Sequence, residues 1–324
     1  MPHRTDKRDY LALMAMLSNM DITFIDGVNG SEMHADAIPP YWKGHASAGE
    51  YGCWRAHLNV YQRMLLDSVQ TALIIEDDAD WDIFLRPQLV DFARGMRWVR
   101  DTTVPLRNSA YGDDWDMLTI GHTGVSNRVD IDQRYWITRD DPTVIAESRR
   151  TWGRKPNMST TLLHGGYNRV VMQVSKLTGT AAYAISLRGA ARILHDQALL
   201  PHATAIDVAI SNMCNRNENS QPFCYGTYPM LVGRYRAIGP KSRDSDRRTS
   251  SNEADPGSGG GQGREERKQP ESEFTVFPVS LHAAKMLQGE TIAGANDPKT
   301  DLVKKVDVKT FVLPKGEGIW VKKS

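Results

Sequence analysis

The chain has 324 residues, 40% of them hydrophobic and 24% charged, which is typical of a globular protein long enough to form a sizeable core. Its 40 Lys and Arg residues balance 39 Asp and Glu residues, which excludes the overall positive charge that attracts nucleic acids or anionic membranes. Apolar residues never run close to 18 in succession, and the first ten residues lack an apolar signal core. We therefore expect no membrane-spanning segment and no secretory signal in this sequence.

The first part of the chain is predicted to alternate helices and strands. Residues 10–20 have helical periodicity, and residues 22–28 form an apolar stretch that predicts a strand stopping at Gly27. A loop rich in Pro, Gly and Ser then leads to a helix over residues 50–69, where large apolar and aromatic residues recur at helical spacing. A strand over residues 71–75 follows directly.

The second part continues this alternation. We predict a helix over 86–101, a strand over 115–122 and a long irregular section to about residue 178. The remaining predicted elements are a strand over 180–186, helices over 187–200 and 207–215, and a strand over 224–235. Strands that alternate with helices favour an α/β fold with a largely parallel sheet.

The composition changes near residue 241, and this sets the expected domain organisation. Residues 241–272 contain almost no apolar side chains and a Gly-Ser run, so they cannot bury enough surface to offset the entropy of ordering. We predict one domain over residues 1–240, a disordered loop over 241–272 and a segment over 273–324 that returns to the domain.

The cysteines point to one disulfide. The three residues, Cys53, Cys214 and Cys224, show no CxxC spacing, so a zinc site or redox pair is not indicated. Cys214 and Cys224 are the one plausible disulfide pair, and only in an oxidising compartment.

An unusual run of acids follows the strand predicted over residues 71–75. Glu76, Asp77 and Asp78 lie at its carboxyl end, where open α/β sheets bind ligands. If the segment is extended, Glu76 and Asp78 point the same way, and two like charges there favour a cation between them. Oxygen ligands suit Mg²⁺ or Mn²⁺, although a solvated acidic turn explains the acids as well. The sequence has no GxxxxGK[ST] and no GxGxxG, so a metal would have to replace a backbone phosphate cradle.

The residues around these acids resemble a known family. The segment GEYGCWRAH (residues 49–57), followed by a strand ending in Glu-Asp-Asp, is similar to the signature of family 25 glycosyltransferases, the lipooligosaccharide and collagen galactosyltransferase relatives. Ala56 stands where that family usually has Ser. The stretches 4–17, 22–30, 116–122, 179–194 and 205–211 also resemble the family pattern, and the likeness is greatest to fungal members.

The resemblance implies an α/β fold of the GT-A type and an inverting transfer of a hexose, expected to be galactose, from a UDP-sugar to a hydroxyl of a glycan or glycoprotein acceptor. It also implies a divalent metal, usually Mn²⁺, with Mg²⁺ as the other candidate. Carried onto this sequence, Asp78 would ligate the metal, while Glu76 would contact metal-bound water or the ribose. Asp77 would orient the loop. The metal would act as a Lewis acid toward the departing diphosphate.

Further site residues are expected on other elements. Asp207 is our candidate for the base that deprotonates the acceptor, with His122 second, although Asp207 could instead be a helix N-cap. Arg4 and Arg8 could reach uridine or the diphosphate, and a solvated charged surface explains them equally well.

Three more side chains have competing explanations. His57 is more typical of a hydrogen-bonded core histidine than of a ligand. Tyr183 fits simple sheet packing. His282 is a weaker candidate for a late metal ligand.

The sequence departs from the family at its start. Members normally first have an apolar strand that helps build the nucleotide pocket, and here that strand is missing. We expect either a truncated gene model or weak binding of UDP. Relatives of the fungal type are expected in the Golgi or secretory lumen, whereas the N-terminus as given would favour the cytoplasm.

Two other functions stay open. One is a degenerate, non-catalytic member that binds sugar or protein. The other is a metal-dependent phosphoesterase, for which His122 and Asp116 would have to supply further ligands. The donor sugar, the acceptor and the linkage cannot be read from these residues.

Overall fold

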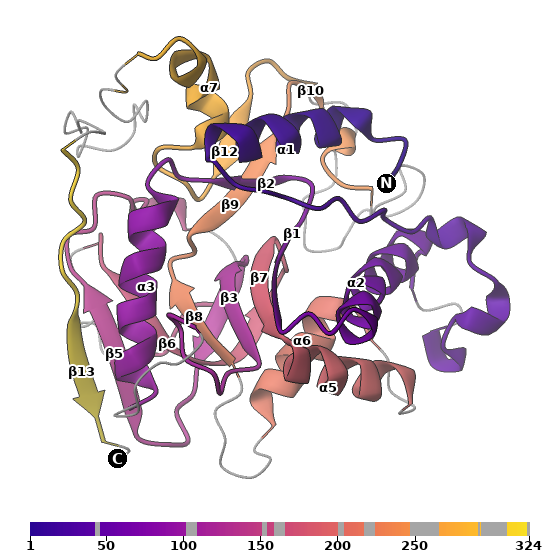
Figure 1. Cartoon of the computed structure of the whole chain (residues 1–324), viewed down its shortest axis with the longest axis horizontal. Helices are drawn as coiled ribbons and strands as arrows, with labels where there is room; N and C mark the ends of the chain where they lie inside the picture. The colour runs from indigo at the N-terminus through magenta and orange to yellow at the C-terminus, as the bar shows by residue number, and fades with distance from the viewer. Residues whose placement is uncertain are drawn as a thin grey trace.

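The computed structural model describes residues 1–42, 46–101, 109–150, 154–158, 166–199, 204–216, 224–246, 266–290, 292 and 310–322. In this part of the chain the central feature is an eight-stranded mixed sheet (Figure 1). Its strands lie in the order β1 (Thr71–Ile75), β7 (Ala182–Ser186), β3 (Met117–Gly121), β8 (Cys224–Tyr228), β6 (Arg169–Thr178), β5 (Gln133–Thr138) and β13 (Glu317–Val321), with β4 (Gly124–Asn127) paired to β6.

Most neighbouring strands of this sheet are antiparallel. Among the described residues only β3 and β8 pair in parallel. The expectation of a largely parallel sheet is therefore wrong. The reason is that β7 lies antiparallel between β1 and β3, and β6 lies antiparallel between β8 and β5.

Smaller sheets lie beside the central one. The first contains β2 (Ala79–Trp81), β9 (Val232–Arg236) and β12 (Glu271–Glu273), with β9 in the middle. The second pairs β10 (Gly239–Pro240) with β11 (Glu266–Arg267). Because β1 belongs to the large sheet and β2 to the small one, the acids Glu76–Asp78 lie at the junction of two sheets.

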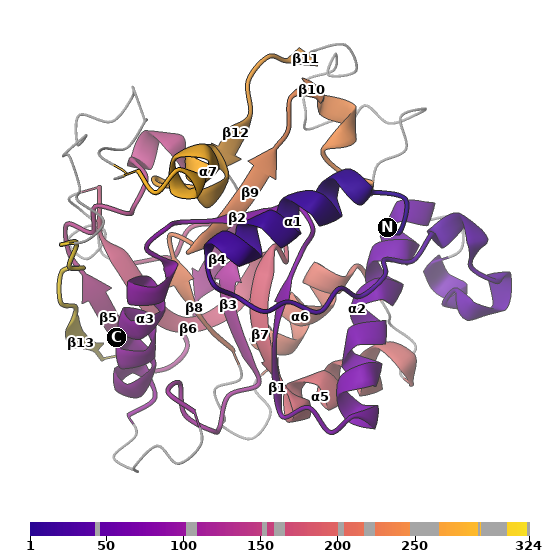
Figure 2. The same cartoon turned by 45° about the horizontal axis from the view of Figure 1, so that its top comes forward.

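Helices cover both faces of the central sheet. The α-helices are α1 (Thr5–Leu17), α2 (Ala48–Leu66), α3 (Leu85–Val99), α5 (Leu187–Ala198), α6 (Ile206–Asn215) and α7 (Val279–Leu287). Short 3₁₀ turns occupy Gly30–Glu32, Ala35–Ala37, Pro40–Trp42, Glu147–Arg149 and Lys241–Arg243. Figures 1 and 2 show α3 on one side of the sheet, α2, α5 and α6 on the other, and α1 with α7 beside the small sheet.

Each face of the sheet has its own apolar core. One core joins α2, α5 and α6 to the sheet through residues such as Leu58, Ile193 and Ile210. The other joins α1 and α3 through residues such as Met14 and Phe92. A mixed α/β sheet flanked by helices on both faces is consistent with the expected GT-A-like fold. β1, the first strand of the described chain, is an edge strand.

Most predicted helices are confirmed, and three local predictions are wrong. Residues 22–28 do not form a strand. They run as irregular chain packed on α2, where a Cβ at Gly52 would collide with the carbonyl oxygen of Val28. The section predicted as irregular contains β4, β5 and β6, whose strand character depends on pairing with distant segments. The strand predicted over 224–235 divides into β8 and β9, which belong to different sheets.

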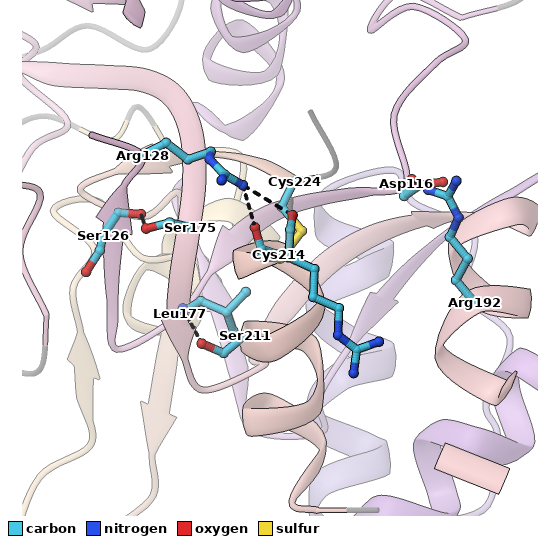
Figure 3. The surroundings of a disulfide bond; sticks show 10 residues. Asp116, Ser126, Arg128, Ser175, Leu177, Arg192, Ser211, Cys214 and Cys224 are labelled. Atoms are coloured by element: carbon cyan, nitrogen blue, oxygen red, sulfur yellow. Dashed lines mark hydrogen bonds and ion pairs between the residues drawn. A yellow bond between two sulfur atoms is a disulfide. The ribbon is translucent and has the colours of Figure 1, made fainter. Parts of the chain in front are cut away.

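The predicted disulfide between Cys214 and Cys224 is confirmed, with the two Cα atoms 5.4 Å apart. It ties the end of α6 to the start of β8. In Figure 3 the Arg128 guanidinium lies beside it and donates to the carbonyl oxygens of Cys214 and Arg216, at 3.3 and 3.4 Å. The disulfide and Arg128 therefore fix the C-terminal end of α6 against the sheet.

The segment predicted to be disordered is described only at its two ends. Residues 241–243 form a 3₁₀ turn, 266–267 form β11 and 271–273 form β12. Residues 247–265 lie outside the described part of the chain. No helix among the described residues combines the length and apolar character needed to cross a bilayer.

Candidate functional site

The acid run forms a turn between β1 and β2. The Ala79 amide donates to the Glu76 carbonyl at 3.1 Å, and the Glu76 amide donates to the Ala181 carbonyl at 2.9 Å. The alternation of an extended strand, which we used to place Glu76 and Asp78 on one side, therefore does not apply to these residues. Their relative positions follow from the turn and from the side chains that they contact.

Each acid of the run has a different positively charged neighbour. The Glu76 carboxylate lies 3.6 Å from His57 Nε2. Asp77 pairs with the Lys7 ammonium at 2.7 Å, and Asp78 pairs with the Arg236 guanidinium at 2.7 Å. Sequence reasoning missed Lys7 and Arg236. Lys7 lies within the stretch 4–17 that resembles the family pattern, which is a usable signal, whereas Arg236 comes from β9 and carries no local signal.

Glu76 is ionised within a hydrogen-bonded site. Burial by itself would raise its pKa, but the hydrogen bond and positive charge of His57, with the Thr180 hydroxyl, bring the pKa below its ordinary value. Thr180 Oγ1 donates to Glu76 Oε1 at 2.5 Å. The same carboxylate oxygen faces His57, so Glu76 Oε1 is fully used within the protein.

His57 is held by a chain of hydrogen bonds. Its Nδ1 lies 2.7 Å from the Tyr183 hydroxyl, which lies 2.5 Å from the Tyr61 hydroxyl. Burial would lower the pKa of His57, but Cys53 and Glu76 raise it to about 9. His57 is thus a hydrogen-bonded core histidine, as expected, and it is also a charged partner of Glu76. Tyr183 contributes a hydrogen bond in addition to sheet packing.

The family-like residues of α2 explain why His57 is in this place. Ser47 and Glu50 form a capping box, in which the Ser47 hydroxyl accepts from the Glu50 amide at 3.3 Å and Glu50 accepts from the Ser47 amide at 2.8 Å. Gly52 leaves room for the Val28 carbonyl to pack directly on the helix. These two features fix the start and the packing of α2, and therefore the direction of His57.

Asp78 differs from Glu76 in its electrostatics. Burial raises the pKa of Asp78, and the negative charge of Glu76 raises it further, against the opposing charges of Arg236, Lys7 and Arg234. An ionised Glu76 therefore disfavours the ionised form of Asp78. A further cation beside them would relieve this repulsion.

The donor set suits a hard divalent cation. Asp78 uses Oδ2 for Arg236, and no described residue donates to its Oδ1. Glu76 likewise uses Oε1 and has no described donor at Oε2. One oxygen of each carboxylate is thus left for a ligand, and Mg²⁺ or Mn²⁺ commonly takes one or two carboxylates together with substrate phosphates. The described residues contain no cluster of three or more His, Cys, Asp or Glu residues that could form an all-protein metal cage.

Asp207 bonds to the same short segment that Glu76 contacts, residues 179–181. Its Oδ2 accepts from the Gly179 amide at 3.2 Å, while Glu76 contacts the next two residues, Thr180 and Ala181. Gly179 has a positive φ of 77°, which favours glycine in this turn. Asp207 is not the helix N-cap: α6 has Ala205 at that position, with no side-chain cap. The turn 179–181 therefore joins the two carboxylates.

The second base candidate, His122, has a different environment. It is buried, and its Nε2 donates to the Thr227 carbonyl at 2.8 Å. Burial lowers the pKa of His122 to about 4, so the ring is neutral near pH 7. Asp116 pairs with Arg188 at 2.5 Å and also with Arg192 (Figure 3). None of these contacts involves the acid turn.

The remaining candidates also have partners of their own. Arg4 pairs with Asp6 at 2.9 Å and with Asp246 at 2.5 Å. Arg8 pairs with Asp26, and its guanidinium lies 5.4 Å from the Phe24 ring centre. His282 Nδ1 donates to the carbonyl of Pro278 at 2.7 Å, within α7.

Comparisons with known proteins give an independent indication of the family. The family model described as glycosyltransferase family 25 (LPS biosynthesis protein) matches residues 1–89. Procollagen galactosyltransferase 1 of Danio rerio is 24% identical over 187 residues, covering 55% of this chain and 24% of that protein. Procollagen galactosyltransferase 1-B of Xenopus laevis is 23% identical over 158 residues, covering 41% of this chain and 24% of that protein.

A glycosyltransferase 25 family member of Aedes aegypti is 21% identical over 215 residues, covering 62% of this chain and 27% of that protein. The chain thus spans about a quarter of the length of the relatives it matches. The expected closeness to fungal members stays a prediction. The matched residues 1–89 contain α1, α2, β1 and the acid turn, and they identify the chain as similar to glycosyltransferase family 25.

Proposed function

We propose that this chain is a metal-dependent inverting glycosyltransferase that moves a hexose, galactose, from a UDP-sugar to a hydroxyl of a glycan or glycoprotein. The observation that carries the proposal is that Glu76 and Asp78 lie in one turn at the end of β1, and that Asp207 and Glu76 bond to neighbouring residues of the segment 179–181. The names of the procollagen galactosyltransferases from Danio rerio and Xenopus laevis support galactose as the sugar.

The metal would be held by Asp78 Oδ1 and Glu76 Oε2, the two oxygens without a described donor. When bound, Mn²⁺ or Mg²⁺ neutralises negative charge on the diphosphate. Asp77 lies on the more exposed side of the turn and pairs with Lys7, an arrangement that holds the turn against α1. Lys7 and Arg236 add positive charge beside the same turn, where a diphosphate would gain from it.

Asp207 would act as the base. Among the described residues, the Asp207 carboxylate accepts hydrogen bonds only from the backbone amides of Gly179 and Val208. No described Lys, Arg or His side chain pairs with its negative charge. The acceptor hydroxyl oxygen would form a bond to the anomeric carbon of the sugar while Asp207 takes the hydroxyl proton. The bond between the anomeric carbon and the phosphate oxygen would break, and its electron pair would leave with UDP. Attack from the face opposite UDP inverts the anomeric centre.

The two alternatives differ in what they require of the site. A phosphoesterase would need more metal ligands, and Asp116 and His122 are engaged elsewhere, so its support is weak. A degenerate member that binds sugar or protein without catalysis would retain the same fold. The disulfide suits an oxidising compartment such as the secretory lumen, which agrees with the expected Golgi location.

The test is hydrolysis and transfer of UDP-galactose, measured with Mn²⁺, with Mg²⁺ and with EDTA. We expect metal-dependent release of UDP, lowered about 100- to 1,000-fold in D78N and E76Q. D67N is the matched control, because the exposed Asp67 pairs with Arg63 at the end of α2, outside the acid turn. Failure to bind UDP with any metal would favour the non-catalytic member, and turnover of simple phosphate esters would favour the phosphoesterase.

A further inference from the structure

A concave site lies at the edge of the central sheet far from the acid turn. It is a pocket of about 300 Å³ formed between the end of α3, the loop before β5, and strands β5, β6 and β13. Arg128, Gln133, Arg134, Gln173 and Trp320 are among the residues that line it. Figure 1 shows β13 and β5 on the side of the molecule opposite β1. This volume is at the lower end of the range typical of small-molecule sites, about 300 to 1,000 Å³.

An exposed tryptophan forms one wall. Trp320 of β13 is 54% exposed, which is unusual for so large an apolar ring. It lies opposite Arg134 in the antiparallel pairing of β13 with β5. The Arg134 guanidinium is 5.8 Å from the Trp320 ring centre and 5.5 Å from that of Trp98, so it lies near both rings.

Two amide side chains in the pocket retain hydrogen-bonding capacity. Gln133 accepts from Asn127 Nδ2 at 2.9 Å through its oxygen, and its NH₂ group has no acceptor among the described residues. The Gln173 side chain has no hydrogen-bond partner in the described part of the chain. Both residues are partly exposed, so their amides can reach a ligand in the pocket.

The charges in the pocket wall are locally balanced. Arg128 pairs with Asp130 at 2.7 Å, and Arg134 pairs with Asp101 at 2.6 Å. Lys322 Nζ lies 5.6 Å from the Trp320 ring centre, on a flexible stem near the end of the described chain. A balanced wall favours a neutral ligand over an anion.

We propose that this pocket binds a neutral saccharide. One sugar ring would place its C–H face on the Trp320 ring, and its hydroxyls would hydrogen-bond to Gln133 and Gln173. An aromatic platform beside a few amide groups fits such a ligand, because a sugar ring has both an apolar face and a rim of hydroxyls. The proposal goes beyond the transferase function and does not depend on it, since none of these residues belongs to the acid turn.

The test is titration of the full chain with lactose, followed by ligand-observed NMR in the presence of EDTA. We expect saturable binding of lactose. W320A and Q173A should each lower the affinity about tenfold, which corresponds to about 1.4 kcal/mol of binding free energy. V321A, at the neighbouring exposed position of β13, is the control and should bind as the wild type does. Thermal unfolding would verify that each variant is folded.

Several outcomes would overturn the proposal. These are absence of saturable binding, equal affinities for W320A and V321A, or, in a parallel titration without EDTA, displacement of lactose by UDP with Mn²⁺, which would place the sugar at the acid turn. Tighter binding of sialyllactose than of lactose would overturn the neutral ligand class. A negative lactose result leaves UDP-galactose hydrolysis unaffected, so failure here and failure of the transferase proposal are distinguishable.

Discussion

The contact between His57 and Glu76 predicts how stability depends on pH. The pKa of His57 is 6.5 in an unstructured chain and rises to about 9 in the folded protein. Below pH 6.5 both states bind the proton, so the full stabilisation is present. Between pH 6.5 and 9 the folded protein retains a proton that the unfolded chain loses, so stability falls as the pH rises.

The size of this effect follows from the shift. Each pKa unit corresponds to about 1.4 kcal/mol, so the rise in the pKa of His57 from 6.5 to about 9 contributes about 3 kcal/mol to the unfolding free energy. His57 is only 7% exposed, so screening by solvent is small. The perturbation is His57→Gln, which can still donate to Glu76 but does not titrate. Urea unfolding of wild type and H57Q in EDTA, from pH 6 to pH 10, measures the difference between them.

We expect the advantage of the wild type over H57Q to shrink by about 3 kcal/mol across this range. C53S separates the two sources of the shift, because Cys53 and Glu76 both raise the pKa of His57. Part of the pH dependence should persist in C53S. A difference between wild type and H57Q that stays constant from pH 6 to pH 10 would refute the charged contact between His57 and Glu76.

Three further predictions concern other parts of the structure. D207N should lower the rate of galactose transfer about 100- to 10,000-fold and leave the affinity for UDP, measured in a calorimeter, unchanged. An equal loss of transfer and of UDP affinity would contradict the role of Asp207 as the base. Replacing Cys214 and Cys224 by Ala should lower the unfolding free energy in urea by about 2–4 kcal/mol, because the disulfide closes a loop with a sequence separation of 10. G52A should cost about 1–3 kcal/mol by clashing with the Val28 carbonyl, and a neutral result would contradict that packing.

The sequence predicted elements best where the signal is local. The helices α2, α3 and α5 bury one face each, so their apolar residues recur at helical spacing. Residues 22–28 have the composition of a strand, but composition cannot supply a partner strand. The sequence did not predict strands β4, β5 and β6, because their extended conformation depends on pairing with segments that are distant in the chain.

For the site, the sequence by itself determined the run Glu76–Asp78 at the end of a strand, the family-like residues of α2 and the aspartate near the start of α6. These are local features, because a strand end and a helix start are set by neighbouring residues. Only the tertiary structure decided that Lys7, Arg236 and His57 neutralise the three acids, and that the turn 179–181 joins Glu76 to Asp207. Each of those contacts joins residues at least 19 positions apart in the chain, and electrostatic partners at such separations are fixed by sheet order and helix packing.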